Sequence, residues 1–510
     1  MKTLNLIALS VLSLSTFANT LGGYSVSEES LCHGFPKAQL ETPEGTCVGI
    51  VATQEDGLKR PRRILALPGG DFIITDMTGW VANKGIVWRF NPTSNTLSKI
   101  FTGIDHAHGL ALGPDGLVYF GSKAQIFSFD PTQELPQKRT VLSGLPTAGN
   151  HPLTHFIFDE EGNLLVNVGA PSDQCLDEKD RPQYPCPESE GKNPEAVIRK
   201  YSKSSGYQSY EVIAKGLRNS MALAIEPLTG QLYQGENGMD FKELETPLEE
   251  INLITKGKHY GWPYCYEDGL LNPKYKRTFF NRRVPKIDCS VYESPVAHLP
   301  AHSAPLDMMF YQGDMFEELN GKLVVSLHGY RETGHRIVSL DLNEQLIPSG
   351  ETRKELVTNW SGKNGLTPKG SPVGMTVAKD GAIWFVEDKN KTIMVFAKGS
   401  QAGQNNQTTQ TQISYKDLTH EQAEEFSFLN KAILKKSCTS CHGQMAGDDE
   451  SVFNTLIDDG FIKPGNKEES SLHFRILNNE NGNQMPLGGK PVDTELTNKL
   501  GLFIDALKTP

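Results

Sequence analysis

The pattern Cys438-Thr-Ser-Cys441-His442 lies near the C-terminus of the chain. Two cysteines at this spacing followed by a histidine form the attachment motif of c-type haem. The thiols of Cys438 and Cys441 would bond to the haem vinyl groups, and His442 would ligate the iron. Met485 follows at a distance that lets it reach the other haem face, and a methionine sixth ligand suits electron transfer. A disulfide or a zinc-binding pair that happens to precede a histidine is the alternative.

The elements expected to hold such a haem are helices. A linker rich in Gly, Gln, Asn, Thr and Ser spans residues 399–414, and helical patterns follow it. We therefore expect a small all-α cytochrome c domain over residues 415–510. One helix is predicted at 421–436, and Asp493 is predicted to cap a second. Their apolar faces are Ala423, Phe426, Leu429, Ala432 and Ile433 in the first, and Leu496, Leu500, Phe503 and Leu507 in the second.

A different repeat fills residues 60–398. Each copy is a turn with glycine followed by a strand of alternating apolar residues, and the first turn glycines, Gly70, Gly116 and Gly162, are evenly spaced. Their spacing is close to the length of one four-stranded propeller blade. Six copies predict a mainly β fold, a six-bladed β-propeller, whose loops converge on one end of a central channel. A β-sandwich with hairpin turns is the alternative.

Several ordered motifs within this region carry candidate site residues. They are His151-Pro-Leu-Thr-His155, Gly216-Leu-Arg-Asn219, Glu236-Asn-Gly238, Glu250-Ile-Asn252 and Tyr260-Gly-Trp-Pro-Tyr-Cys-Tyr266. In this order they resemble the soluble quinoprotein glucose/sorbosone dehydrogenase family, nearer its sorbosone-dehydrogenase-like branch. The resemblance implies a six-bladed propeller that binds pyrroloquinoline quinone (PQQ) and calcium.

The resemblance also implies roles for single residues. His151 stands where the family has its general base, which takes the proton of a substrate hydroxyl. Arg218 and Asn219 stand where the family contacts the cofactor, and Arg218 would stabilise an oxygen that becomes anionic. Gly238 and Met239 occupy the positions whose backbone carbonyls bind calcium.

Further candidates lie in two other loops and include departures from the family pattern. His106 and His108 precede the second blade strand, and His328 and Arg331 follow the fifth. His328 lies near the place of a cofactor-binding lysine in the glucose branch. At Ser371-Pro-Val373 that branch has two arginines for the cofactor carboxylates, which Arg331 or Arg336 would have to replace.

Composition bounds the class of protein. The net charge of −11 argues against a nucleic-acid partner, and the hydrophobic fraction of 37% suits globular domains. Residues 1–18 are predicted to be a secretory signal peptide, with a retained anchor as the alternative. No later apolar run is long enough to span a bilayer, so we expect a periplasmic mature chain without a membrane span. Residues 19–59 are predicted to be an N-terminal extension before the propeller.

Six of the eight cysteines lie outside the haem motif and form three local pairs. Such proximity in an oxidising compartment favours disulfides. Many connectivities are possible for six cysteines, and zinc is the rival interpretation. The pairs are Cys32 with Cys47, Cys175 with Cys186, and Cys265 with Cys289.

Together these features predict a periplasmic quinohaemoprotein dehydrogenase. A sugar or a related alcohol or aldehyde would be oxidised with PQQ, and electrons would pass to the fused haem c and then to an external acceptor. One alternative is a non-catalytic propeller that binds a ligand or partner and docks the cytochrome. Another is a metal-dependent, lactonase-like propeller.

Overall fold

The chain folds into two compact units, Met1–Gly399 and Ser400–Pro510. The computed structural model describes residues 20–279, 282–329, 331–360, 370–399, 413–437, 447–458, 461–467, 470–477 and 492–507. The predicted signal peptide (1–18) and nearly all of the predicted linker (399–414) lie outside these residues.

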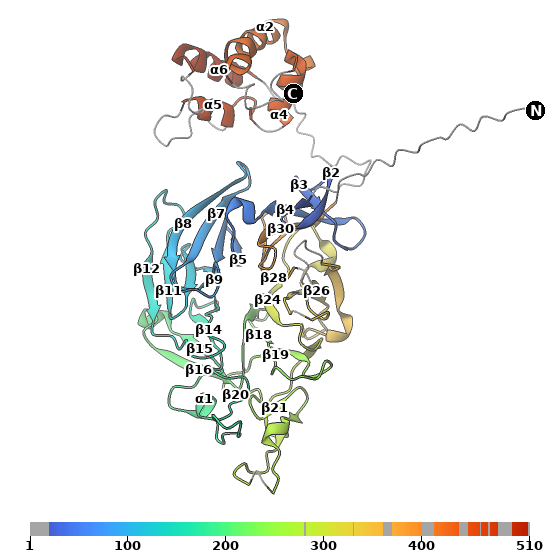
Figure 1. Ribbon diagram of the computed structural model, residues 1–510. Helices are drawn as coiled ribbons and strands as arrows, with labels where there is room; N and C mark the ends of the chain where they lie inside the picture. The colour runs from blue at the N-terminus through green and yellow to red at the C-terminus, as the bar shows by residue number, and fades with distance from the viewer. Residues whose placement is uncertain are drawn as a thin grey trace, which may run out of the picture. The chain divides into compact units, whose positions relative to one another are not determined.

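The first unit is built from sheets whose strands are mainly antiparallel (Figure 1). Within the described residues there are six sheets of at least four strands, and their strands follow one another along the chain. They consist of β5 (Pro61–Ala66), β6 (Phe72–Asp76), β7 (Gly85–Asn91) and β8 (Thr96–Ile104); β9 (Ala107–Leu112), β10 (Val118–Ser122), β11 (Gln125–Phe129) and β12 (Arg139–Ser143); β13 (Phe156–Phe158), β14 (Leu164–Val168), β15 (Val197–Tyr201) and β16 (Tyr210–Lys215); β17 (Ala222–Ile225), β18 (Leu232–Glu236), β19 (Glu249–Leu253) and β23 (Ala297–Leu299); β24 (Pro305–Phe310), β25 (Leu323–Leu327), β26 (Arg336–Leu340) and β27 (Lys354–Val357); and β28 (Pro372–Val377), β29 (Ile383–Glu387), β30 (Thr392–Lys398) and β4 (Thr46–Ala52).

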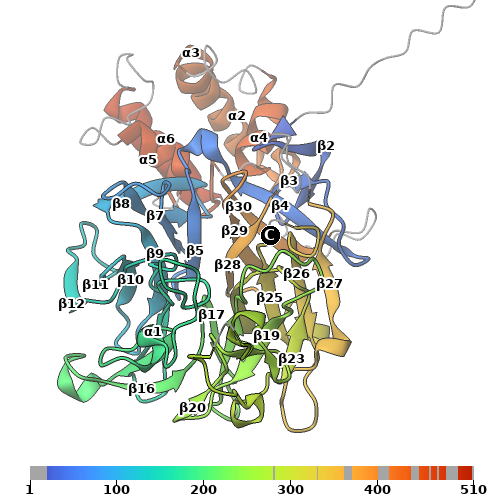
Figure 2. The same cartoon turned by 60° about the horizontal axis from the view of Figure 1, so that its bottom comes forward.

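The six sheets form a closed ring (Figure 2). The first strand of each sheet, β5, β9, β13, β17, β24 or β28, contacts the first strand of the next, and β28 contacts β5. This arrangement is a β-propeller, as the repeat predicted. The first and second strands of every blade are joined by a turn that contains a glycine at positive φ. This backbone conformation favours glycine because a Cβ would be crowded there. The six turn glycines are Gly70, Gly116, Gly162, Gly230, Gly321 and Gly381.

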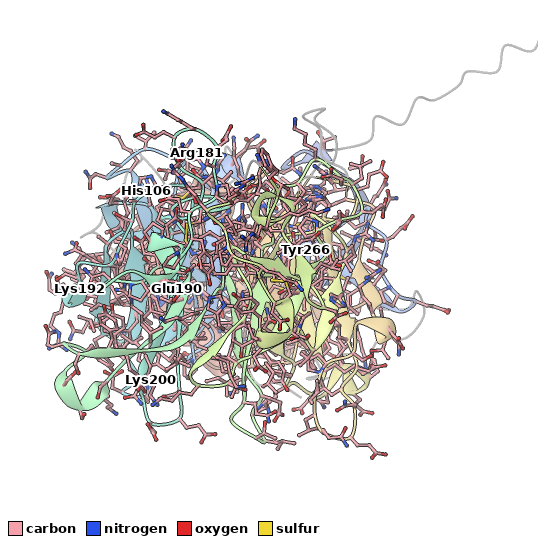
Figure 3. The ribbon with its side chains drawn as sticks, turned by 90° about the horizontal axis from the view of Figure 1, so that it is seen from below. His106, Arg181, Glu190, Lys192, Lys200 and Tyr266 are labelled. Carbon is pink, nitrogen blue, oxygen red and sulfur yellow. A yellow bond between two sulfur atoms is a disulfide. The ribbon has the colours of Figure 1, made fainter. Side chains whose placement is uncertain are left out.

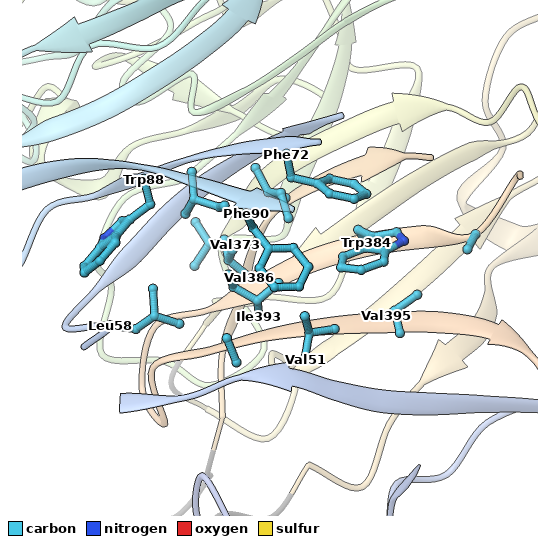
Figure 4. Close-up of a cluster of buried hydrophobic side chains, with 14 of the residues drawn as sticks. Val51, Leu58, Phe72, Trp88, Phe90, Val373, Trp384, Val386, Ile393 and Val395 are labelled. Atoms are coloured by element: carbon cyan, nitrogen blue, oxygen red, sulfur yellow. The ribbon is translucent and has the colours of Figure 1, made fainter. Parts of the chain in front are cut away.

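The N-terminal segment differs from its prediction. The residues expected to form an extension at 19–59 instead add strands to the last blade, because β4 pairs with β30 and covers an edge that would otherwise be open. Three further strands, β1 (Thr20–Leu21), β2 (Tyr24–Cys32) and β3 (Phe35–Ala38), widen this sheet. Apolar side chains of the first and last blades then pack together, with Phe72 stacked on Trp384 at 4.1 Å between ring centroids (Figure 4).

Two disulfide-closed loops extend the third and fourth blades. Cys175 bonds to Cys186, and Cys265 bonds to Cys289; with Cys32–Cys47 they confirm the predicted pairing. The two loops share an apolar cluster that includes Trp262, so we treat them as one insert. Its short elements are α1 (Pro187–Glu190), β20 (Lys258–His259), β21 (Cys265–Tyr266) and β22 (Leu270–Leu271).

The described part of the second unit is helical. The helix predicted at 421–436 is observed as α2 (His420–Leu429), a π-helical segment Asn430–Leu434 and α3 (Lys435–Ser437). Asp493 caps the last helix through the backbone amides of Glu495 and Leu496, as predicted. The other helices are α4 (Asp449–Asp458), α5 (Ser471–Leu477) and α6 (Thr494–Ala506).

The predicted haem residues, Cys438, Cys441, His442 and Met485, lie outside the described residues. The helices nevertheless share a core in which Phe426 packs edge-on against Phe453 at 5.0 Å between ring centroids. Across the described part of the chain, none of the helices has the length and apolar character that crossing a bilayer demands.

Candidate active site

Blade topology gathers the predicted site residues at one end of the ring. In an antiparallel blade, the turn between the first two strands lies at one end. The loop after the second strand and the loop leading into the next blade therefore lie at the other. Figure 3 labels residues from both kinds of loop, His106 before β9 and Arg181 in the connection from β14 to β15. The same end also receives His151, Arg218 and Asn219, which precede first strands, and Gly238, Met239, His328 and Arg331, which follow second strands.

His151 and Arg218 are connected through the backbone of Ala170. The Nδ1 atom of His151 lies 2.6 Å from the carbonyl oxygen of Ala170, whose own amide donates to the carbonyl of Arg218 at 2.7 Å. Gly169 makes this approach possible, because a Cβ there would lie 2.6 Å from Cβ of His151. Burial, and next the charge of Arg218, lower the pKa of His151 to about 4. The imidazole is therefore neutral at ordinary pH.

Arg218 is buried and held by two carboxylates. Its Nη2 lies 2.9 Å from Oδ1 of Asp173 and 2.8 Å from Oδ2 of Asp240, and its Nη1 donates to the carbonyl of Asn237 at 3.0 Å. The insert fixes Asp173, since the indole N–H of Trp262 donates to its carbonyl at 2.8 Å. The sequence motifs did not identify Asp173, although its place two residues before Cys175 was a usable signal.

Asn219 and the Gly238 loop lie beside this arginine. The carbonyl of Asn219 accepts hydrogen bonds from the backbone and side chain of Asn237, which tie the two loops together. The amide of Gly238 donates to Oε2 of Glu249 at 2.5 Å. Met239 is buried, and its sulfur accepts a hydrogen bond from Asn272. The structure thus brings together all the residues predicted for the cofactor and calcium in this blade.

Three buried glutamates surround the same loop. Burial raises the pKa of Glu236 to about 8 and the pKa of both Glu249 and Glu250 to about 7. A cavity of about 20 Å³ lies between Gly238, Met239, Glu236 and Glu250. Within the described ranges, no cluster of three or more His, Cys, Asp or Glu side chains is arranged to hold a metal ion.

A second buried ion pair involves the first and last blades, and the sequence motifs did not identify it. Arg62 Nη1 lies 2.6 Å from Oδ2 of Asp388, and Nε2 of His328 lies 3.0 Å from the other oxygen of that carboxylate. Burial alone would raise the pKa of Asp388, but His328 and Arg62 hold it well below its usual range. Arg62 lies in the basic run Lys59-Arg60-Pro-Arg62-Arg63, which offered a signal.

The remaining predicted residues have distinct surroundings. His108 lies on first strand β9, is 1% exposed, and packs edge-on against His155. It therefore belongs to the interior of the ring. His106 contacts the carboxylate of Asp105 through Nδ1.

Arg331 and Arg336, which were expected to replace the two cofactor-binding arginines of the glucose branch, also have different surroundings. Arg331 donates to the backbone carbonyls of Phe241 and Glu243, and so braces the loop that follows Met239. Arg336 instead pairs with Glu355 at 2.9 Å. Its pairing directs it to a neighbouring strand of its own blade.

Comparison with known proteins assigns this chain to a family. An uncharacterized protein of Borreliella burgdorferi is 33% identical over 391 residues, which cover 70% of this chain and 90% of that protein. Aldose sugar dehydrogenase YliI of Escherichia coli is 26% identical over 205 residues, 38% of this chain and 50% of that enzyme, so the match spans only half of its length.

The structure also resembles a solved propeller. The holo form of the pyranose dehydrogenase PQQ domain from Coprinopsis cinerea superposes with a TM-score of 0.56 at 19% identity, covering 72% of this chain and 100% of that one. The TrAA12-like family profile matches residues 42–399. This range includes the strands of all six blades and the site residues described above. The chain therefore belongs to the TrAA12-like family.

Proposed function

We propose that this protein is a periplasmic dehydrogenase that oxidises a sugar or a related alcohol or aldehyde with PQQ and calcium, and passes the electrons to a haem c in its C-terminal region. The carrying observation is the chain of hydrogen bonds from His151 through Ala170 to Arg218 at the loop end of the ring. The names of two similar proteins, an aldose sugar dehydrogenase and the PQQ domain of a pyranose dehydrogenase, support this substrate class and this cofactor.

The residues at this end fit a planar quinone that carries carboxylates. Basic side chains come from several blades, with Arg62 in the first, Arg218 in the fourth and His328 in the fifth. Buried polar atoms there have no hydrogen-bond partner among the described residues, namely Nε of Arg62, Nε of Arg218 and Oδ1 of Asn219. Because unsatisfied buried polar groups are costly, a polar ligand that reaches them would be favoured. Arg62, Arg218, Asn219 and His328 would therefore hold the cofactor.

Calcium would bind at the loop after β18. The carbonyls of Gly238 and Met239 are hard oxygen ligands of the kind calcium prefers. The adjacent cavity of about 20 Å³ has room for one ion or water. Buried Glu236 and Glu250 line it, and their negative charge in the ionised state would favour a cation there.

The chain's own part in the reaction is to move a proton. Nδ1 of His151 must donate to the Ala170 carbonyl, so Nε2 carries the lone pair and serves as the base. It would take the hydroxyl proton of the substrate while the carbinol carbon becomes a carbonyl. When bound, PQQ accepts the hydride that leaves this carbon. Asp173 and Asp240 fix the position of Arg218. Its guanidinium would stabilise negative charge that develops on the hydride acceptor.

Electrons would leave through the C-terminal unit. The motif Cys438-Thr-Ser-Cys441-His442, with Met485, would hold a six-coordinate haem c suited to one-electron transfer. Covalent fusion would give this acceptor a high effective concentration. An external respiratory acceptor would then oxidise the haem.

The test follows the haem spectrum of the full chain, exported in a host that attaches haem c. After addition of calcium and PQQ, an aldose should reduce the haem, and His151→Asn should bind PQQ with reduction slowed at least ~100-fold. Cys441→Ala should still oxidise the sugar with an added dye. If dithionite reduces the haem but no member of a broad aldose and alcohol panel does, the dehydrogenase proposal fails. Absence of stoichiometric PQQ binding would favour the non-catalytic ligand-binding propeller.

A further inference from the structure

Trp80 stands apart from the other tryptophans of the chain. It is 57% exposed, whereas Trp88, Trp262, Trp360 and Trp384 are all 6% exposed or less. An indole is a large apolar surface that proteins usually bury, and an exposed one beside a binding site commonly meets a ligand. Trp80 follows β6, the second strand of the first blade, so it lies at the end of the ring that holds His151 and Arg218.

The base of the Trp80 loop is held firmly. The carboxylate of Asp76, at the end of β6, accepts hydrogen bonds from the amides of Lys59, Arg60 and Thr78, each at 2.8 Å. These bonds tie the start of the loop to the segment that leads into Arg62. The indole is therefore presented from a fixed base, which reduces the entropy lost when a ligand stacks on it.

Polar groups lie directly beside the indole. The imidazole of His106 is 5.8 Å from the Trp80 ring, centroid to centroid, and is inclined to it by 49°. Its Nδ1 contacts Oδ1 of Asp105, whose side chain is 32% exposed. An apolar ring next to an imidazole and an accessible carboxylate matches a pyranose, which has a face of C–H groups and a rim of hydroxyls.

We propose that Trp80, Asp105 and His106 form a pyranose subsite at the rim of the channel. The C–H face of the sugar stacks on the indole, and Asp105 and His106 hydrogen-bond its hydroxyls. This assignment rests on the proposed function and narrows it to cyclic sugars. Acyclic alcohols have no comparable flat face, so they gain nothing from Trp80.

The kinetic test compares D-glucose with 1,2-propanediol as substrates of the reconstituted full chain. Trp80→Ala should raise KM for glucose about tenfold, as expected for loss of one stacking contact. KM for 1,2-propanediol and kcat for both should change less than about twofold, and Trp80→Phe should restore most of the affinity for glucose. Val81→Ala is the matched control, since Val81 is the adjacent residue and equally exposed at 57%. Equal increases in KM for the two substrates would overturn the proposal.

A second test needs neither PQQ nor turnover. Iodide should quench Trp80 selectively because the other four tryptophans are buried. D-glucose should protect against this quenching with a saturable dependence, and 1,2-propanediol at equal concentration should not. Protection without dehydrogenase activity would keep the sugar subsite and reject the proposed function. Lack of protection by D-glucose and other aldopyranoses would reject the subsite, whatever the activity.

Discussion

His151 and Arg218 share one backbone residue, Ala170, which accepts from the imidazole of His151 and donates to the carbonyl of Arg218. The first bond sets the histidine tautomer, and the second keeps the guanidinium-bearing loop beside it. The low pKa of His151, about 4, follows from burial and from the nearby positive charge. His151, a base that is neutral over most of the pH range, is thus coupled to Arg218, the cation that would stabilise negative charge on the hydride acceptor.

Replacing Arg218 with leucine should move the acid limb of activity to higher pH. The positive charge favours neutral His151, so its removal raises the histidine pKa from about 4 toward its ordinary value of roughly 6.5. The base is then protonated, and inactive, at a higher pH. Profiles of kcat/KM against pH at saturating PQQ measure this limb. Arg181→Leu removes an exposed arginine of the insert and should leave the limb unchanged. An unmoved limb in Arg218→Leu would contradict the coupling.

Replacing Tyr24 with phenylalanine should test whether the N-terminal strands stabilise the last blade. The buried hydroxyl donates to Glu387 at 3.2 Å and accepts from Trp360 at 2.7 Å and Asn390 at 2.9 Å. Its loss leaves buried partners unsatisfied, so unfolding in urea should show a loss of about 1–3 kcal/mol. Tyr210→Phe, at a 41% exposed tyrosine, should cost less than about 0.5 kcal/mol. If Tyr24→Phe lost no more stability than this control, the Tyr24 hydroxyl would not stabilise the last blade.

Local chemistry made part of this fold predictable. Turn glycines at positive φ and cysteines close in sequence are signals that a few residues carry by themselves, and both predictions hold in the structure. The pairing of β4 with β30 was not predictable in this way. Thr46–Ala52 is a continuous apolar run without strand alternation, and its partner lies at the far end of the propeller sequence.

The residues of the candidate site likewise include some that the sequence identified and some that it did not. His151, Arg218 and Gly238 lie in motifs that resemble a family, so the sequence alone selected them. Arg62 and Asp388 lie in no such motif, and their ion pair joins residues 326 apart in sequence. Such a pair exists only after the ring closes, because closure brings the first blade beside the last.

Replacing Asp388 with alanine should destabilise the propeller strongly. The change leaves the guanidinium of Arg62 buried without its 2.6 Å partner and removes the hydrogen-bond partner of His328. Breaking one side of a buried pair costs about 3–5 kcal/mol, which urea unfolding would register. Asp177→Ala breaks the exposed pair with Arg181 and should lower stability far less, because solvent screens exposed ion pairs. Similar losses in the two variants would mean that the Arg62 pair is not buried as described.

Removing one of the two disulfides of the insert, Cys175–Cys186, should weaken cofactor binding as well as stability. Cys175 lies two residues after Asp173, which holds Arg218 at 2.9 Å, so a loosened loop releases the arginine. The double replacement of Cys175 and Cys186 with alanine should lower stability by about 3 kcal/mol through the entropy of the opened loop. The dissociation constant of PQQ should rise at least ~10-fold, as measured by titration at a temperature where the variant is folded.

The matched control for this prediction is the double replacement of Cys32 and Cys47. Its disulfide closes a loop of similar length, with a sequence separation of 15 against 11, so the loss of stability should be similar. It lies in the added strands of the last blade and contacts none of the Arg218 partners, and PQQ affinity should therefore stay the same. Equal effects of both pairs on PQQ binding would show that general loosening is responsible. An effect confined to Cys175–Cys186 would establish that the insert positions Arg218 through Asp173.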